Sequence, residues 1–218
     1  MNTNTKKAAP PEPNHTAQPS CSFPGESHWH DPFAKDKTPE KHIEYIMKRL
    51  YGPGINSANR LPEMLSYLGD FSFTPKVAWP VIHSAWGDCD NTWEHREDLI
   101  EFLDMLNSMG DSEGMQPTDY LRPEDKAAFE SQPNYIRIYR GCSISRVYGF
   151  SWTADRKIAE SFAQGHRGII VPDPVIASFR IPKTRALGYY TDRMESEVLV
   201  DPSDVKRYAV TVTKFWDW

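Results

Sequence analysis

Apolar positions in the first half of the chain recur at helical spacing. Between Thr38 and Gly52 they repeat with a period near 3.6, which predicts a helix over 39–51. The same spacing, together with capping residues and breakers, predicts helices starting at Thr74-Pro75, over 94–110 and over 123–130. Pro80 is expected to kink or restart the helix that starts at Thr74-Pro75. A polar loop is expected at 111–118.

The second half follows a different pattern, in which short β-branched and aromatic runs alternate with Gly, Pro and Asp turns. We predict strands over the runs at 135–139, 168–171, 175–181, 197–200 and 208–215. A short strand at 149–153 leads into a helix over 154–163, which Thr153 is expected to cap. Helices followed by strands indicate an α+β fold.

The first 37 residues show no apolar periodicity and contain six prolines among polar residues. This composition predicts a disordered tail over 1–37 that is dispensable for chemistry. The rest of the chain divides into a helical segment over 38–131 and a sheet-rich half over 132–218, on which the helices are expected to pack. A length of 218 residues suits one large domain or two small ones.

Charge is spread unevenly over these segments. The formal net charge of -5 is the sum of 0 over 1–37, -9 over 38–131 and +4 over 132–218. The basic last segment is the better candidate for binding an anionic ligand. Charged side chains that only face solvent, and happen to be distributed unevenly, would give the same counts.

Cysteine usage and apolar runs indicate the compartment. Three separated cysteines, with no C-x-x-C pair, predict neither a disulfide framework nor a zinc site. No apolar run approaches the ~18 residues of a membrane span, and the first 18 residues lack the apolar stretch of a signal peptide. We therefore expect a cytoplasmic protein without a membrane partner.

Three short motifs in the sheet-rich half carry polar groups suited to chemistry. Arg140 ends a strand beside Gly141, where its planar fork of donors suits either a phosphate or an ion-pair partner. Ser151 and Thr153 belong to the short strand before a helix, where hydroxyls either line a site or cap the helix.

The third motif, Glu195-Ser196-Glu197, opens an apolar strand. Alternation along a strand predicts that both carboxylates lie on one face. Two like charges held together cost free energy unless they are exposed at a sheet edge or used in chemistry. Carboxylate pairs of this kind act at the anomeric carbons of sugars.

In their order and spacing, Tyr139-Arg140-Gly141, the stretch 149–153 and Glu195-Ser196-Glu197 resemble the R-S-E group of arginine-type mono-ADP-ribosyltransferases. The closest likeness is to short members from bacteria and their phages, a group that includes toxin-like effectors. The resemblance covers about residues 133–202. It implies an ADP-ribosyltransferase-like split β-sheet with an NAD cleft, in an enzyme that transfers ADP-ribose from NAD to an arginine of a target protein and releases nicotinamide.

The resemblance also implies which residues bind NAD. Arg140 would hold the NAD phosphates and stiffen the cleft. Gly141 would offer backbone hydrogen bonds to the nicotinamide carboxamide. Ser151 would position the carboxylate of Glu197, and Thr153 would support the cleft.

Within the carboxylate pair, the resemblance implies a division of roles. Glu197 would hydrogen-bond the nicotinamide ribose as the glycosidic bond breaks, because a carboxylate stabilises the positive charge that develops there. Glu195 would orient and help deprotonate the acceptor arginine, whose guanidinium is a poor nucleophile while protonated. No metal is required, because nicotinamide leaves as a neutral molecule.

The segment 183–194 is expected to form the loop that recognises the target protein in this family. Tyr189 and Tyr190 are the candidate substrate-contact residues in it. Ordinary packing of aromatic side chains is the other interpretation of these two tyrosines.

Three other functions fit parts of the sequence. An NAD glycohydrolase would use water as the acceptor, although the presence of Glu195 favours transfer. A catalytically silent interaction module would use the acidic helical segment as its working surface, but it would not require Arg140, Ser151 and Glu197. A nucleic-acid acceptor is disfavoured by the net negative charge and by the lack of a basic stripe interleaved with aromatics.

Overall fold

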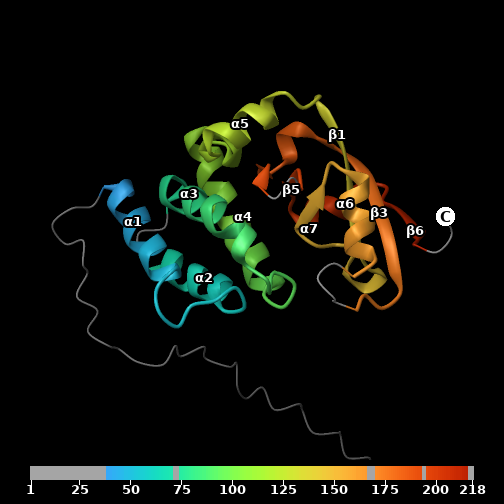
Figure 1. Cartoon of the computed structure of the whole chain (residues 1–218). Coiled ribbons are helices and arrows are strands. Elements are labelled where there is room, and N and C mark those ends of the chain that lie inside the picture. Colours follow the sequence, from blue (N-terminus) through green and yellow to red (C-terminus); the bar gives the residue numbers. More distant parts are fainter. Residues whose placement is uncertain (1–37, 71–73, 166–169, 193–194, 216–218) are drawn as a thin grey trace, which may run out of the picture.

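The computed structural model describes residues 38–70, 74–165, 170–192 and 195–215, and the predicted tail over 1–37 lies outside these ranges. Helices fill the first half of the described chain and strands dominate the second, so the α+β class is confirmed. Figure 1 shows the helical half, in blue and green, beside the sheet, in yellow to red.

Three of the predicted helices begin at the expected prolines. They are α1 (Pro39–Leu50), α3 (Pro75–Ala85) and α5 (Pro123–Glu130). Proline suits the first turn of a helix because its missing N–H would have no partner there. Helix α3 continues through Pro80 instead of restarting there.

Helix α4 (Arg96–Glu113) begins two residues later than the predicted 94–110 and ends three residues later, because Gly110 does not end it. Gly110 is buried inside the helix, and its carbonyl oxygen accepts a hydrogen bond from the N–H of Met115 at 2.9 Å. The helix ends at Gly114, whose φ of 69° is the left-handed conformation that glycine adopts readily. The loop expected at 111–118 therefore starts later than predicted.

Helix α2 (Arg60–Asp70) is an additional helix that was not predicted. Leu61, Met64 and Leu68 are fully buried on one of its faces. Their spacing is helical, so the signal for α2 is present in the sequence.

Within the described residues, six strands form one antiparallel sheet in the order β4-β5-β2-β1-β3-β6. The strands are β1 (Tyr135–Ser143), β2 (Ser151–Thr153), β3 (Pro174–Pro182), β4 (Gly188–Tyr190), β5 (Glu197–Leu199) and β6 (Thr211–Lys214). β1 and β3 pair along their whole length. The part β4-β5-β2 joins the part β1-β3-β6 where Tyr139 of β1 pairs with Thr153 of β2.

Several strand boundaries differ from the prediction. β1 runs on to Ser143, and β4 lies inside the stretch 183–194 that was expected to be a loop. Of the strand predicted at 168–171, residues 168–169 lie outside the described ranges, and Ile170 and Val171 belong to no strand.

The cap of helix α6 (Arg156–Ala163) also differs from the prediction. Asp155, not Thr153, caps it, with its side chain accepting from the N–H of Lys157 at 2.8 Å. Thr153 lies further upstream in β2, where its hydroxyl accepts a hydrogen bond from the N–H of Asp155 at 3.0 Å.

The sheet has a different neighbour on each face. A buried hydrophobic cluster on one face includes Trp79 and Leu99 of the helical half together with Ile138 and Val198 of the strands. On the other face, α6 packs on β1, as Figure 1 shows, with Ala159 against Ile176. The helical half and the sheet therefore share a core.

None of the helices in the described ranges is both long and apolar enough to cross a membrane.

Candidate active site

Arg140 is half-buried in β1, and its guanidinium donates hydrogen bonds to two backbone carbonyl groups, one between β1 and β2 and one in β2. Its Nε donates to the carbonyl oxygen of Arg146 at 3.1 Å, and Nη1 donates to the carbonyl oxygen of Ser151. Burial lowers the pKa of Arg140, but an arginine stays charged at neutral pH. These bonds fix a positive charge at the join between β1 and β2.

Gly149 makes room for the Arg140 guanidinium. A Cβ at this position would lie 2.4 Å from Nη2 of Arg140, which is closer than two such atoms can approach. Gly149 is buried one residue before Phe150. This glycine therefore permits the observed arginine position.

Glu197 opens β5, next to the strand that carries Ser151. The Ser151 hydroxyl hydrogen-bonds its carboxylate, and the positive charge of Arg140 acts on it as well. Arg140, Ser151 and Glu197 therefore come together, although they are far apart in the sequence. The roles that the resemblance implies for these three residues stay predictions.

Opposing influences act on the Glu197 carboxyl. Burial raises its pKa above the ordinary value, and the nearby charge of Glu195 raises it further. The hydrogen bonds from Ser151 and Trp86, and then the charge of Arg140, lower the pKa and so favour the ionised form.

Trp86 belongs to this site but was not predicted from the sequence. It lies in the 3₁₀ turn η1 (Trp86–Asp88), directly after α3, and is 2% exposed. Its indole Nε1 donates to Oε1 of Glu197 at 2.9 Å. Nothing in the local pattern around Trp86 indicates a partner on a distant strand.

Alternation predicted that Glu195 and Glu197 lie on one face of the same strand, and this prediction is wrong because Glu195 lies outside the strand. Ser196 between them has a φ of 44°, so the strand begins only at Glu197. Glu195 is half-buried and lies in the turn before β5. The two carboxyl groups still interact, because the charge of Glu195 acts on Glu197.

Thr153 fixes this turn to β2. Its hydroxyl donates to the carbonyl oxygen of Glu195, and its backbone pairs with Glu197. The carbonyl oxygen of Ser196 accepts from the N–H of Ala154 at 3.0 Å. A non-glycine residue held at positive φ is a local strain that these bonds help to maintain.

Gly141 has a packing role in this structure. A Cβ on it would lie 1.7 Å from the carbonyl oxygen of Ala159, so it lets α6 approach β1 closely. Its backbone pairs with Ile176 of β3. The nicotinamide contact predicted for its backbone stays a prediction.

Tyr189 and Tyr190 lie in β4, not in an exposed loop, and are 3% and 5% exposed. Tyr189 packs near Phe129, with 6.1 Å between the ring centroids. The hydroxyl of Tyr190 is 2.9 Å from Nδ1 of His83. Their burial favours packing over contact with a target protein, so we assign them no substrate contact.

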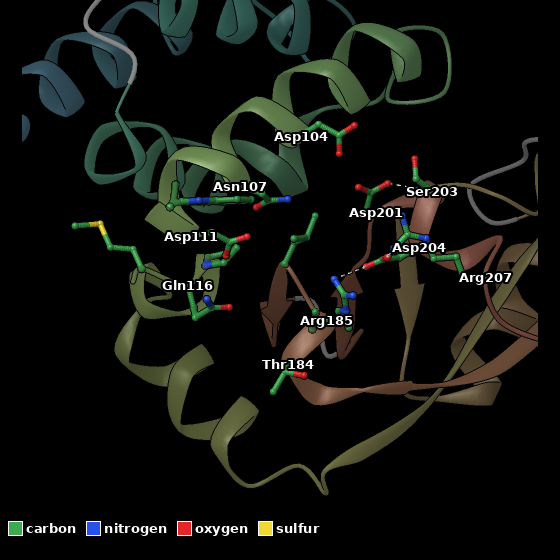
Figure 2. Close-up of a pocket in the computed structure, with 16 residues that line it drawn as sticks. Asp104, Asn107, Asp111, Gln116, Thr184, Arg185, Asp201, Ser203, Asp204 and Arg207 are labelled. Atoms are coloured by element: carbon green, nitrogen blue, oxygen red, sulfur yellow. Dashed lines mark hydrogen bonds and ion pairs between the residues drawn. The ribbon is translucent and has the colours of Figure 1, made fainter. Parts of the chain in front are cut away.

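A pocket of about 250 Å³ lies apart from this cluster, between α4 and the segment that carries η5 (Lys183–Arg185) and α7 (Pro202–Val205) (Figure 2). Arg140, Ser151 and Glu197 do not line it. Asp204 in its wall lies 3.6 Å from Arg185 and 3.2 Å from Arg207. Asp104, Asp111 and Asp201 line it as well, and nothing in this mixed set of charges specifies a ligand.

Among the residues that the structure describes, no group of three or more His, Cys, Asp or Glu side chains is placed to hold a metal ion. The chain matches no model of a known protein family, no curated protein and no solved structure.

Proposed function

We propose that this protein is a mono-ADP-ribosyltransferase, which cleaves NAD and transfers ADP-ribose to an arginine side chain of a target protein. The observation that carries the proposal is the meeting of Arg140, Ser151 and Glu197 at the join between β1, β2 and β5. The proposed NAD cleft lies at this join. There a fixed guanidinium suits the phosphates and a carboxylate suits the ribose.

In the proposed reaction, the bond between nicotinamide N1 and ribose C1 breaks, and its electron pair leaves with neutral nicotinamide. Positive charge then spreads over C1 and the ring oxygen, where the Glu197 carboxylate stabilises it. A nitrogen of the acceptor guanidinium attacks C1. The proton it loses passes to the Glu195 carboxylate and from there to solvent.

The surroundings of Glu197 are consistent with this role. Burial strengthens the interaction of its carboxylate with a developing cation, because few water molecules compete. The Ser151 hydroxyl beside it favours the ionised carboxylate before the reaction. Preorganisation of this kind is usually the largest contribution to stabilising a charged transition state.

The test is a paired assay on the full chain with labelled NAD and a cell lysate. Nicotinamide release and label incorporation are followed in the same samples, and the modified residue is identified by mass spectrometry. Glu197→Gln is expected to reduce both activities about 100-fold or more, because it removes the stabilising charge. Glu113→Gln, at the exposed end of α4, serves as the matched control.

Glu195→Ala separates transfer from hydrolysis. It removes the proposed base for the acceptor but leaves Arg140, Ser151 and Glu197 in place, so transfer should be lost while slow nicotinamide release persists. A chain that releases nicotinamide without labelling any protein would be a glycohydrolase. Full nicotinamide release by folded Glu197→Gln would contradict the proposed site.

A further inference from the structure

Trp86 lies between the two halves of the molecule at the candidate site. It follows α3 of the helical half, and its indole contacts both Glu197 and the ring of Phe150, the residue before Ser151. The rings of Trp86 and Phe150 meet edge to face, with centroids 6.0 Å apart and planes at 69°. The indole is therefore held in a defined orientation toward the carboxylate.

The donor and the acceptor of this hydrogen bond are unambiguous. An indole N–H only donates, so the oxygen of Glu197 must accept. A hydrogen bond to an ionised carboxylate is stronger than a bond between neutral groups. The contact therefore stabilises the carboxylate form more than the protonated form.

We propose that Trp86 is a positioning residue for Glu197, through which the helical half holds the carboxylate in place and in its ionised form. The catalytic meaning of this inference rests on the proposed function. The hydrogen bond itself does not, so the two can be tested separately.

The groups around Glu197 show why such a donor matters. Burial raises the pKa of Glu197. Among the charged and titratable groups that face it, Glu195 in the preceding turn opposes ionisation and Arg140 in β1 favours it. Tyr190 in β4 also interacts with Glu197, but its phenol is neutral, because burial raises its pKa well above the ordinary value. The donors that offset burial are Ser151 in β2 and Trp86 in η1.

The first experiment measures the pKa of Glu197 directly in the full chain. Side-chain carboxyl carbons of glutamate are labelled with ¹³C, and the Glu197 signal is identified by its loss in Glu197→Gln. Trp86→Phe removes the N–H but keeps an aromatic ring, and should raise the apparent pKa of Glu197 by about one pH unit. The matched control is Trp79→Phe, at another buried tryptophan of the helical half, which should leave this pKa unchanged.

The second experiment follows nicotinamide release against pH. Because Glu197 must be ionised to act, the acidic limb of the profile should move to higher pH in Trp86→Phe by the same amount as the pKa. The rate should recover toward the wild-type value at alkaline pH. Faster release by the variant at all pH values would overturn the inference, because Trp86 would then obstruct the site.

A third measurement needs no variant at position 86 and covers the case in which Trp86→Phe does not fold. In the wild-type chain, the Nε1–H signal of Trp86 should titrate with the same midpoint as Glu197, and this response should vanish in Glu197→Gln. An unresponsive indole signal, or a Glu197 pKa that is unchanged in folded Trp86→Phe, would refute the inference. If both responses appear but the wild type releases no nicotinamide, it is the proposed function that fails.

Discussion

Two glycines beside Arg140 exclude a side chain for different reasons. At Gly141 a Cβ would meet the backbone of Ala159 in α6 at 1.7 Å, and backbone cannot move aside without shifting the helix. At Gly149 a Cβ would meet the guanidinium of Arg140 at 2.4 Å, which is the end of a side chain. The first glycine therefore serves the packing of the fold, and the second serves the placement of one charge.

This difference predicts that alanine affects binding at Gly149 but stability at Gly141. Gly149→Ala should fold but displace Arg140, and calorimetry should show the proposed binding of NAD weakened about tenfold, which is about 1.4 kcal/mol. Gly141→Ala should lower the free energy of unfolding by about 3 kcal/mol or more in chemical denaturation, because the core is overpacked. Unchanged NAD affinity in Gly149→Ala would show that the guanidinium position does not matter for binding.

At the scale of elements, α5 and its N-cap residue Arg122 hold Thr191 and Asp192, the two residues that follow β4. Asp125 of α5 is 1% exposed, and its Oδ1 accepts from both the N–H and the hydroxyl of Thr191, each at 2.8 Å. Its Oδ2 accepts from Nε and Nη2 of Arg122 at 2.8 and 2.6 Å. Arg122 also reaches Asp192 at 2.7 Å.

Asp125→Ala should therefore destabilise the chain by about 2 kcal/mol, because hydrogen bonds to a buried charged group are lost. Urea denaturation monitored by circular dichroism measures this change. Glu124→Gln is the matched control: Glu124 is exposed and lies 3.6 Å from the same Arg122, so its replacement should change stability by less than about 0.5 kcal/mol. Similar losses in the two variants would mean that the Thr191 contacts contribute little.

Local sequence signals decide how well each element can be predicted. The bounds of α5 follow from Pro123 and from a polar residue on each side of its apolar positions, and they agree with the structure. Thr153 misleads as a cap, because its hydroxyl is used by the Glu195 carbonyl from a distant segment. Strand β4 is three residues long, so its alternation is too short to distinguish from a loop with two tyrosines.

At the scale of the whole molecule, the candidate site divides into a part that could be predicted and a part that could not. Motif order selected Arg140, Ser151 and Glu197 as candidates, because all three lie in short strand-like runs of the sheet-rich half. Trp86 reaches Glu197 across 111 positions of sequence. Such a contact depends on how the helical half packs against the sheet, and no local pattern records that packing.

His83 joins the helical half to the sheet through a hydrogen-bonded chain. Its Nε2 is 2.9 Å from the carbonyl oxygen of Pro117, which can only accept, so this nitrogen carries the proton. Nδ1 then accepts from the Tyr190 hydroxyl at 2.9 Å. Both ring nitrogens are therefore satisfied while the imidazole is neutral, and burial lowers the pKa of His83 to about 4.

The stability of the whole chain should therefore depend on pH through His83. An unfolded histidine has a pKa of about 6.5, so between about pH 6.5 and pH 4 the unfolded state binds a proton that the folded state does not. The free energy of unfolding consequently falls as the pH falls through this window, by about 3 kcal/mol from this residue. His83→Gln can make both hydrogen bonds without titrating, so urea denaturation of the variant should lack this contribution. Because Glu197 and other groups titrate in both proteins, the informative quantity is the difference between their unfolding free energies at each pH. A difference that stays constant from pH 7 to pH 4 would show that His83 becomes protonated in the folded chain as readily as in the unfolded one.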